Sequence, residues 1–252
     1  MESLVATGER TAPGLADEEY WFARHEAGYA AIPDLLPGLI PGGRVVDAGA
    51  GEGYGAAMLR DAGAAVVSLE YDVAACAHAS RRYAGIPVVR ANLAALPLAS
   101  ASLDAIVSAQ VVEHLWDLPG FLRDCRRALR PGGALLVTTP NRLTFSPGLG
   151  RGDKPTNPFH VEEFDAEQVG ALLADAGFDR VEVRGLDHGG RIARWEQAHG
   201  SIVRAQVDAV LSGHWPAGLR GFVSTITRDD FVIAAGSPES AADLIGIGWV
   251  AS

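Results

Sequence analysis

A glycine-rich turn between a predicted strand and a predicted helix is the first feature of the sequence that could do chemistry. Residues 44–55 read Arg-Val-Val-Asp-Ala-Gly-Ala-Gly-Glu-Gly-Tyr-Gly, an apolar run followed by four alternating glycines. Glycine permits positive φ and lets a ligand approach the backbone without meeting a Cβ atom. Four glycines exceed what a chain reversal needs, so the turn is predicted to bind a sizeable ligand.

The charge of the turn discriminates between two kinds of ligand. Residues 51–56 also fit the dinucleotide pattern G-x-G-x-x-A, and Glu70 follows at a suitable distance. Asp47 and Glu52, however, place two carboxylates beside the turn, and these would repel a pyrophosphate. S-Adenosylmethionine carries an ammonium, a sulfonium and a ribose but no phosphate. The acidic turn therefore favours S-adenosylmethionine, with Glu70 expected to accept hydrogen bonds from the ribose hydroxyls.

The elements that must position this turn alternate between short apolar runs and helical patterns. Strands are predicted at 44–48, 65–69, 86–90, 105–108 and 134–138, with helices at about 54–62, 73–84 and 117–129. Apolar strands that are buried on both faces and alternate with helices are typical of a parallel sheet built from βαβ units. The chain is therefore predicted to be an α/β protein with a doubly wound sheet.

A loop and an insertion follow residue 140, where the regular alternation ends. Residues 141–160 are rich in Pro, Gly, Asn and Ser, which predicts a lid or binding loop. A helical insertion is expected over 187–242, before a last strand around 244–250. Acidic residues at 17–19 suit the start of an N-terminal helix over 17–37. We expect residues 1–252 to form one domain, because single α/β domains reach this length.

Composition excludes several classes of partner. The formal net charge of −10 and the pI near 5.1 argue against nucleic acid, because neutralising phosphates requires clustered Lys and Arg. Cys76 and Cys125 lie far apart and form no CxxC pair, so we expect buried or half-buried free thiols. No apolar run approaches the roughly 20 residues of a membrane span, and the N-terminus lacks a secretory pattern. A cytoplasmic protein is expected.

Together, these motifs resemble the class I S-adenosylmethionine-dependent methyltransferases, over about Arg44 to Thr139. Besides the turn and Glu70, the resemblance rests on Asn92–Leu98, Leu103–Ser108, Glu113–Leu115 and Leu129–Gly133. It implies a Rossmann-like sheet of seven strands, parallel apart from one antiparallel strand near an edge, with an N-terminal helix and a helical insertion before the last strand.

The resemblance also implies which residues hold the cofactor. They are Asp47, Gly49, Gly51, Gly53, Glu70, Tyr71, Asn92, Leu93 and Gln110. Asn92 stands where the family usually has an Asp that contacts the adenine amino group, and its carbonyl oxygen can make a similar contact. Leu93 would contribute its backbone amide, whereas Gln110 occupies a position that is often acidic in relatives. Arg24 on the N-terminal helix could pair with the methionine carboxylate.

Four further segments resemble a narrower actinobacterial group of sugar O-methyltransferases associated with methylglucose lipopolysaccharide biosynthesis. They are Thr7–Thr11, Glu19–His25, Thr139–Gly148 and Asn157–His160. The resemblance implies transfer of a methyl group to a hydroxyl of a sugar, glycan or glycoside. An O-methyltransferase of a small phenolic or quinone-like acceptor, a non-catalytic cofactor-binding protein and a nicotinamide oxidoreductase are the alternatives.

Methyl transfer to a hydroxyl needs an aligned acceptor and removal of a proton. His114 follows the fourth strand, at the edge of the sheet where ligands bind, and a His in this vicinity is the general base in the O-methyltransferases that the chain resembles. Glu113 is expected to orient His114 or to approach the substrate. The structural alternative is a His at a helix start that packs against Trp116.

Substrate contacts are expected from the N-terminal helix, the 141–160 loop and the insertion. The candidates are Tyr20, His25, Asn141, His160 and His188, with Phe159, Trp195 and Trp215 as aromatic platforms for a sugar. Each has a structural alternative as a core or solvated residue. No metal site is predicted, because no carboxylate pair shows ligand spacing. Magnesium is left open, since some sugar methyltransferases that the chain resembles use it. Formation of a homodimer is also left open by the sequence.

Overall fold

The computed structural model describes residues 11, 13–14, 17–234 and 237–252. The segment 7–10, which contributes to the narrower resemblance, therefore lies outside the described residues. No helix in the described ranges is long and apolar enough to cross a membrane. Both cysteines are free, as expected, with Cys125 buried and Cys76 half-buried.

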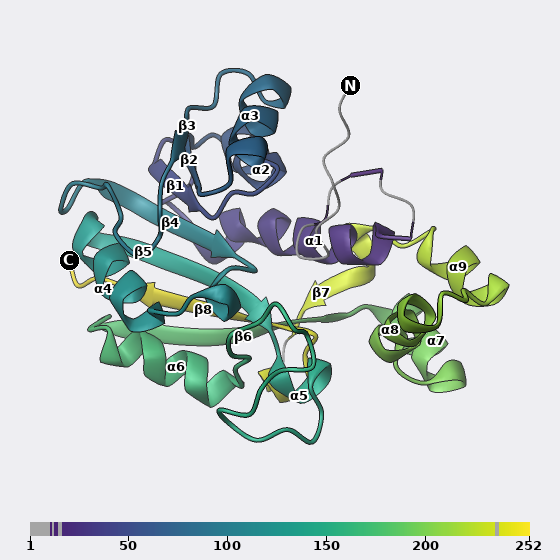
Figure 1. Cartoon of the computed structure of the whole chain (residues 1–252). Helices are drawn as coiled ribbons and strands as arrows, with labels where there is room; N and C mark the ends of the chain where they lie inside the picture. Colours follow the sequence, from purple (N-terminus) through teal and green to yellow (C-terminus); the bar gives the residue numbers. More distant parts are fainter. Residues whose placement is uncertain (1–10, 12, 15–16, 235–236) are drawn as a thin grey trace.

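A central sheet organises the fold, and Figure 1 shows its strands side by side with helices around them. Its strands are β1 (Arg44–Ala48), β2 (Ala65–Glu70), β3 (Val88–Arg90), β4 (Leu103–Ala109), β5 (Leu129–Pro140), β6 (Arg180–His188), β7 (Phe231–Ile233) and β8 (Asp243–Trp249). Their order is β3-β2-β1-β4-β5-β8-β6-β7. The first five strands pair in parallel, as the alternation of strands and helices predicts.

The prediction of seven strands with one antiparallel member was wrong. The described residues form eight strands, and both β8 and the edge strand β7 run against the others. Strand β7 has only three residues and lies inside 187–242, which the sequence presents as a helical insertion. So short a strand leaves no period-two pattern to detect. Residues 187–188 also belong to β6 rather than to the insertion.

Helices cover both faces of the sheet. They are α1 (Glu19–Leu35), α2 (Tyr54–Asp61), α3 (Val73–Arg82), α4 (Leu118–Ala128), α5 (Arg142–Phe145), α6 (Ala166–Asp175), α7 (Gly190–His199), α8 (Ile202–Ser212) and α9 (Ala217–Val223). Apolar residues of α1 and α2 pack on one face, and those of α4 and α6 pack on the other. Figure 1 shows α7, α8 and α9 grouped at one end of the molecule.

Aspartates at the helix starts explain why several of these helices begin where they do. The side chains of Asp72, Asp117 and Asp165 accept hydrogen bonds from backbone N–H groups in the first turns of α3, α4 and α6. Such caps satisfy donors that have no partner within the helix. At Asp165 the cap is reciprocal, because Gln168 accepts from the Asp165 backbone N–H.

The contact between α1 and α2 depends on Gly55, which lies under the ring of Tyr29. A Cβ at Gly55 would lie 2.1 Å from Cζ and 2.5 Å from the hydroxyl of Tyr29. Tyr29 is buried and donates a hydrogen bond to Asp47, so its ring is fixed from the other side. No space remains for a side chain at position 55.

We therefore expect Gly55→Ala to lower the free energy of unfolding by about 1–2 kcal/mol in urea denaturation. Overpacking costs about 1–3 kcal/mol, which outweighs the gain of up to about 1 kcal/mol in helix propensity. Gly221→Ala is the matched control, because a Cβ at Gly221 in α9 meets no atom within 4 Å. That variant should be stabilised by about 0.5–1 kcal/mol. Equal stabilisation of both variants would contradict the packing argument.

Candidate active site

A cleft of about 500 Å³ opens where β1, β2 and β4 end. It is lined by Gly49, Gly51, Glu70, Tyr71, Asn92, Leu93, Ala94, Gln110, Val111, His114, Leu115, Trp116, Asp117 and Phe121. Neighbouring parallel strands end at the same edge of a sheet, so the segments after them converge there. Most of the cofactor residues predicted from the sequence therefore meet in one cleft.

The glycine turn is shaped for close approach by a ligand. Gly49 and Gly51 have φ values of +84° and +50°, a region that favours glycine. A Cβ at Gly51 would meet no atom within 4 Å, so the backbone there is open toward the cleft. A Cβ at Gly49 would lie 2.5 Å from Val111, another lining residue. The turn therefore exposes its backbone to the cleft.

Glu70 joins the turn after β1 to the end of β2. One carboxylate oxygen accepts from the Gly51 N–H at 2.8 Å, and the other accepts from the N–H groups of Tyr71 and Asp72, each at 2.8 Å. Three backbone donors hold the carboxylate in one orientation at the edge of the cleft. Because an oxygen has two lone pairs, this arrangement can also accept hydrogen bonds from a ligand's hydroxyls.

The charge of the lining fits S-adenosylmethionine. Among the described residues that line the cleft there is no Lys or Arg, while Glu70 and Asp117 contribute carboxylates. A pyrophosphate would need cationic partners, whereas a sulfonium, an ammonium and a ribose do not. The open backbone at Gly51 and the fixed acceptor at Glu70 suit the same ligand.

Asp47, Gly53 and Arg24 do not line the cleft, although the sequence places them at the cofactor. Asp47 is fully buried, where it accepts a hydrogen bond from the Tyr29 hydroxyl at 2.9 Å. Its Oδ2 has no hydrogen-bond partner among the described residues. Burial raises the pKa of Asp47 to about 7, although the bond from Tyr29 opposes the shift. Gly53 lies against Ala79 of α3.

Arg24 is a buried cation that already has a carboxylate partner. Its Nη1 lies 3.0 Å from Oδ1 of Asp243, and its Nη2 donates to the side-chain oxygen of Gln110 at 3.2 Å. Gln110 also donates to Thr138, and its backbone has a φ of +56°, which is strained for a residue with a side chain. Arg24 thus reaches the cleft through Gln110, and its contact with a methionine carboxylate stays a prediction.

His114 lies in the cleft beside two residues that do not line it, Glu113 and His160. The rings of His114 and His160 have centroids 5.0 Å apart. His114 Nδ1 lies 3.1 Å from the carbonyl oxygen of Phe159, so a backbone group rather than Glu113 orients the ring. Glu113 is buried and accepts from the Thr139 hydroxyl at 3.0 Å, and burial raises its pKa to about 7.

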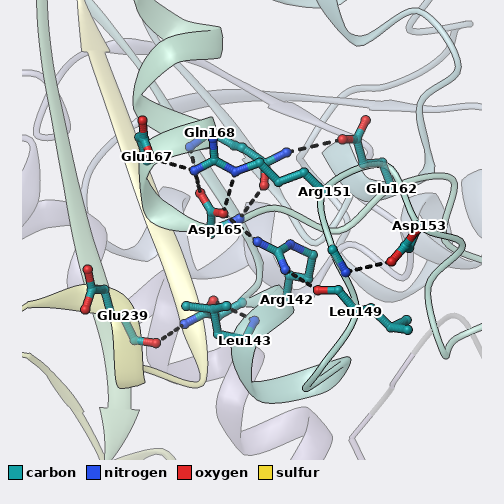
Figure 2. A network of polar contacts seen from close by, with 12 residues as sticks. Arg142, Leu143, Leu149, Arg151, Asp153, Glu162, Asp165, Glu167, Gln168 and Glu239 are labelled. Atoms are coloured by element: carbon teal, nitrogen blue, oxygen red, sulfur yellow. Dashed lines mark hydrogen bonds and ion pairs between the residues drawn. The ribbon is translucent and has the colours of Figure 1, made fainter.

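The 141–160 loop leaves the sheet at one side and returns to the cleft. Near its start lies the short helix α5, and Figure 2 shows Arg142 and Arg151 converging on the carboxylate of Asp165, with distances of 2.5 and 3.0 Å. Asn141 is fully buried and donates to three backbone carbonyls of 238–241, which is a structural role. The loop lies beside the cleft at its end, where Phe159 and His160 contact His114.

The other predicted substrate residues lie away from the cleft. His25 Nδ1 and the Tyr54 hydroxyl are 3.2 Å apart, and burial together with Arg24 lowers the pKa of His25 well below its usual value. The Tyr20 hydroxyl of α1 and His188 Nε2 at the end of β6 are 2.7 Å apart. These contacts fix the N-terminal helix against α2 and the end of β6.

The predicted aromatic platforms separate in the structure. Trp195 lines a different cavity of about 870 Å³ among α7, α8 and α9, and Trp215 lies beside Arg220 of α9. Phe159 alone adjoins the cleft, through its carbonyl contact with His114. Trp116, Asp117 and Phe121 also line the cleft, although no binding role was predicted for them. Their positions directly after His114, at the same strand end, were the available signal.

Comparisons with known proteins identify the family that the chain resembles. Residues 46–137 match a family described as a methyltransferase domain. A protein of Mycolicibacterium smegmatis named "Probable S-adenosylmethionine-dependent methyltransferase" is 44% identical over 250 residues, covering 97% of this chain and 95% of the relative. A ubiquinone biosynthesis O-methyltransferase of Parvibaculum lavamentivorans is 28% identical over 164 residues, covering 60% and 65%.

Among solved structures, an S-adenosylmethionine-dependent methyltransferase of Thermotoga maritima has a TM-score of 0.61 and 19% identity, covering 92% of this chain and 94% of the other. This likeness shows the fold.

The raised pKa of Asp47 predicts how stability depends on pH. Because the pKa is about 7 in the folded protein against 3.8 ordinarily, Asp47 favours folding below about pH 4, and that contribution is lost as the pH rises through 7. Asn does not titrate, so the free energy of unfolding of Asp47→Asn should rise relative to that of the unmodified protein as the pH increases from about 4 to 7. The expected difference across this range is up to roughly 4 kcal/mol. Urea denaturation at several pH values measures the difference. A difference that does not change with pH would contradict the buried, protonated carboxyl.

Proposed function

Because the chain belongs to the S-adenosylmethionine-dependent methyltransferases, we propose that it methylates a hydroxyl of a sugar, glycan or glycoside. Membership of the family makes the chain an enzyme and S-adenosylmethionine its cofactor. It also sets aside the nicotinamide oxidoreductase and the non-catalytic alternatives.

Exposed aromatic rings beside His114 carry the proposal for the acceptor. Trp116 lines the cleft with 90% of its surface exposed, and Phe159, which is bonded to His114 through its carbonyl, is 47% exposed. Large aromatic residues usually bury their rings, so exposure of both at one site suits a ligand that stacks on them. Sugars present apolar faces to such rings and hydroxyls to the neighbouring polar groups.

Different residues of the cleft bind different parts of the cofactor. Glu70 accepts from the ribose hydroxyls, Asn92 and the Leu93 amide contact the adenine, and the open backbone at Gly51 allows close approach. When bound, S-adenosylmethionine supplies a methyl group on a positively charged sulfur. Gln110, whose side-chain amide is held by Arg24 and Thr138, lines the same cleft as His114.

His114 is the lining residue that activates the acceptor hydroxyl. Its Nδ1 faces a carbonyl oxygen, which can only accept a hydrogen bond, so the ring proton lies on Nδ1 and Nε2 keeps a lone pair. An imidazole nitrogen with a free lone pair, placed near the acceptor hydroxyl, accelerates methyl transfer by removing the hydroxyl proton. It can also act indirectly, by holding another group that removes this proton. His160 and Glu113 lie close enough to modify this role.

A small phenolic or quinone-like acceptor is the second candidate. The 28% identity with a ubiquinone biosynthesis O-methyltransferase favours it, because a phenol also stacks on exposed aromatic rings.

A panel of acceptors tests the proposed function. The protein is incubated with methyl-labelled S-adenosylmethionine and with monosaccharides, oligosaccharides, glycosides and phenols, and products are identified by mass spectrometry. We expect label on a sugar hydroxyl, because the cleft offers both stacking rings and polar groups. Label on phenols alone would replace the sugar with the second candidate, and label on no hydroxyl would refute both.

We expect His114→Ala to bind S-adenosylhomocysteine with nearly unchanged affinity but to lose turnover by about 100-fold or more. The binding residues Glu70 and Asn92 are untouched, whereas activation of the hydroxyl is removed. His214→Ala, at an exposed position, is the matched control and should keep full turnover. Calorimetry and the labelled-methyl assay give the two readouts. Full turnover in His114→Ala would remove this residue from the chemistry.

A further inference from the structure

We propose that Glu113, His114 and His160 bind a divalent first-row transition-metal cation beside the cofactor cleft. The inference rests on the proposed function, because the cation would act on the acceptor hydroxyl. One ligand atom from each residue lies within 4.8 Å of the others. Two ligand atoms at about 2.1 Å from one cation lie at most about 4.2 Å apart, so small side-chain rotations complete the set.

Two segments far apart in sequence bring the three residues together. Glu113 and His114 belong to the short 3₁₀ turn Val112–His114 after β4, and His160 ends the 141–160 loop. The Glu113 carbonyl accepts from the Val161 N–H at 2.7 Å and from the Glu162 N–H at 3.3 Å. The backbone therefore fixes the loop end against the 3₁₀ turn, independently of any side-chain contact.

Each of the three side chains already has the supporting hydrogen bond that metal ligands usually have. His114 Nδ1 faces the Phe159 carbonyl, and His160 Nδ1 lies 2.6 Å from the Glu163 carboxylate. Both partners only accept hydrogen bonds, so both rings carry their proton on Nδ1 and keep a lone pair on Nε2. Glu113 is bonded by the Thr139 hydroxyl. In metal sites, such hydrogen-bonding partners orient the histidine and carboxylate side chains that bind the metal.

The structural alternative is that His160 only anchors the loop. Its Nε2 accepts from the Asn157 amide at 2.9 Å, and a cation would replace this hydrogen bond. Two buried carboxyl groups beside the ligand atoms favour the cation. Glu113 and Glu163 are 1% and 2% exposed, and Glu163 Oε2 has no hydrogen-bond partner among the described residues. Glu163 already has His160 as its partner through Oε1, and a cation on Nε2 of the same ring would place further positive charge near both carboxyl groups.

The ligand set indicates the class of cation and its action. Two imidazoles and one carboxylate suit Zn²⁺, Mn²⁺, Fe²⁺ or Co²⁺ better than Mg²⁺, and they leave coordination positions open. An acceptor hydroxyl in an open position loses its proton to solvent more readily. Its oxygen then takes the methyl group, and the sulfur keeps the electron pair of the broken carbon–sulfur bond. His114 thus activates the hydroxyl through the cation it holds.

Metal titration of the full-length, tag-free protein tests the site. We expect one equivalent of Zn²⁺ by calorimetry and of Co²⁺ by visible absorption, with weaker binding of Mg²⁺. His160→Ala should bind Zn²⁺ about 100-fold more weakly, whereas the exposed control His214→Ala should match the unmodified protein. S-Adenosylhomocysteine affinity, measured on the same samples, reports whether each variant is folded.

Glu163→Gln provides a second test that keeps all three ligands. It should weaken Zn²⁺ binding by about 10-fold or more, because the His160 ring loses its carboxylate partner. The absence of a single Zn²⁺ site, equal affinity in His160→Ala or Glu163→Gln, or tighter binding of Mg²⁺ than of Zn²⁺ would overturn the proposal.

The acceptor panel separates this inference from the proposed function. Full methylation of a sugar in excess chelator, by protein that binds no Zn²⁺, would refute the cation site and leave the proposed function standing. One Zn²⁺ site that depends on His160, in protein that methylates no hydroxyl, would support the site and refute the proposed function.

Discussion

The pairing of β1 between β2 and β4 is the constraint on which the site depends. Asp47 pairs with Ser68 on one side and with Val107 on the other, so the three strands end at nearly the same level. The glycine turn, the carboxylate of Glu70 and the segment from Gln110 to Phe121 consequently share one cleft. The hydrogen bond from the Gly51 N–H to Glu70 then fixes the first two of these segments relative to each other.

Buried polar contacts add the remaining parts of the site to this edge. The ion pair between Arg24 and Asp243 holds α1 against the start of β8. Arg24 also donates a hydrogen bond to the side chain of Gln110. At the other side, the Glu113 carbonyl holds the end of the 141–160 loop beside His114. A buried charge left without its partner is costly, so loss of either Arg24 or Asp243 would disturb this side of the site.

The sequence predicted the parts of the site that lie close to a strand end. Gly49, Gly51, Glu70, Asn92 and His114 each follow a predicted strand, and the topology of a parallel sheet brings them together. The contacts between distant segments carried no such signal. Asp243 lies 219 residues from Arg24, and His160 lies far from Glu113, so spacing could not pair them. Strand β7 was missed because three residues cannot establish a periodic pattern.

A crystal structure of the protein with S-adenosylhomocysteine tests the central claim most directly, because it locates the cofactor without relying on a substrate. We predict that the ribose hydroxyls lie within hydrogen-bond distance of the Glu70 carboxylate and that the adenine lies beside Asn92 and Leu93. The sulfur should lie on the side of the cleft that leads to His114. Electron density for the ligand outside this cleft, such as in the cavity among α7, α8 and α9, would contradict the account.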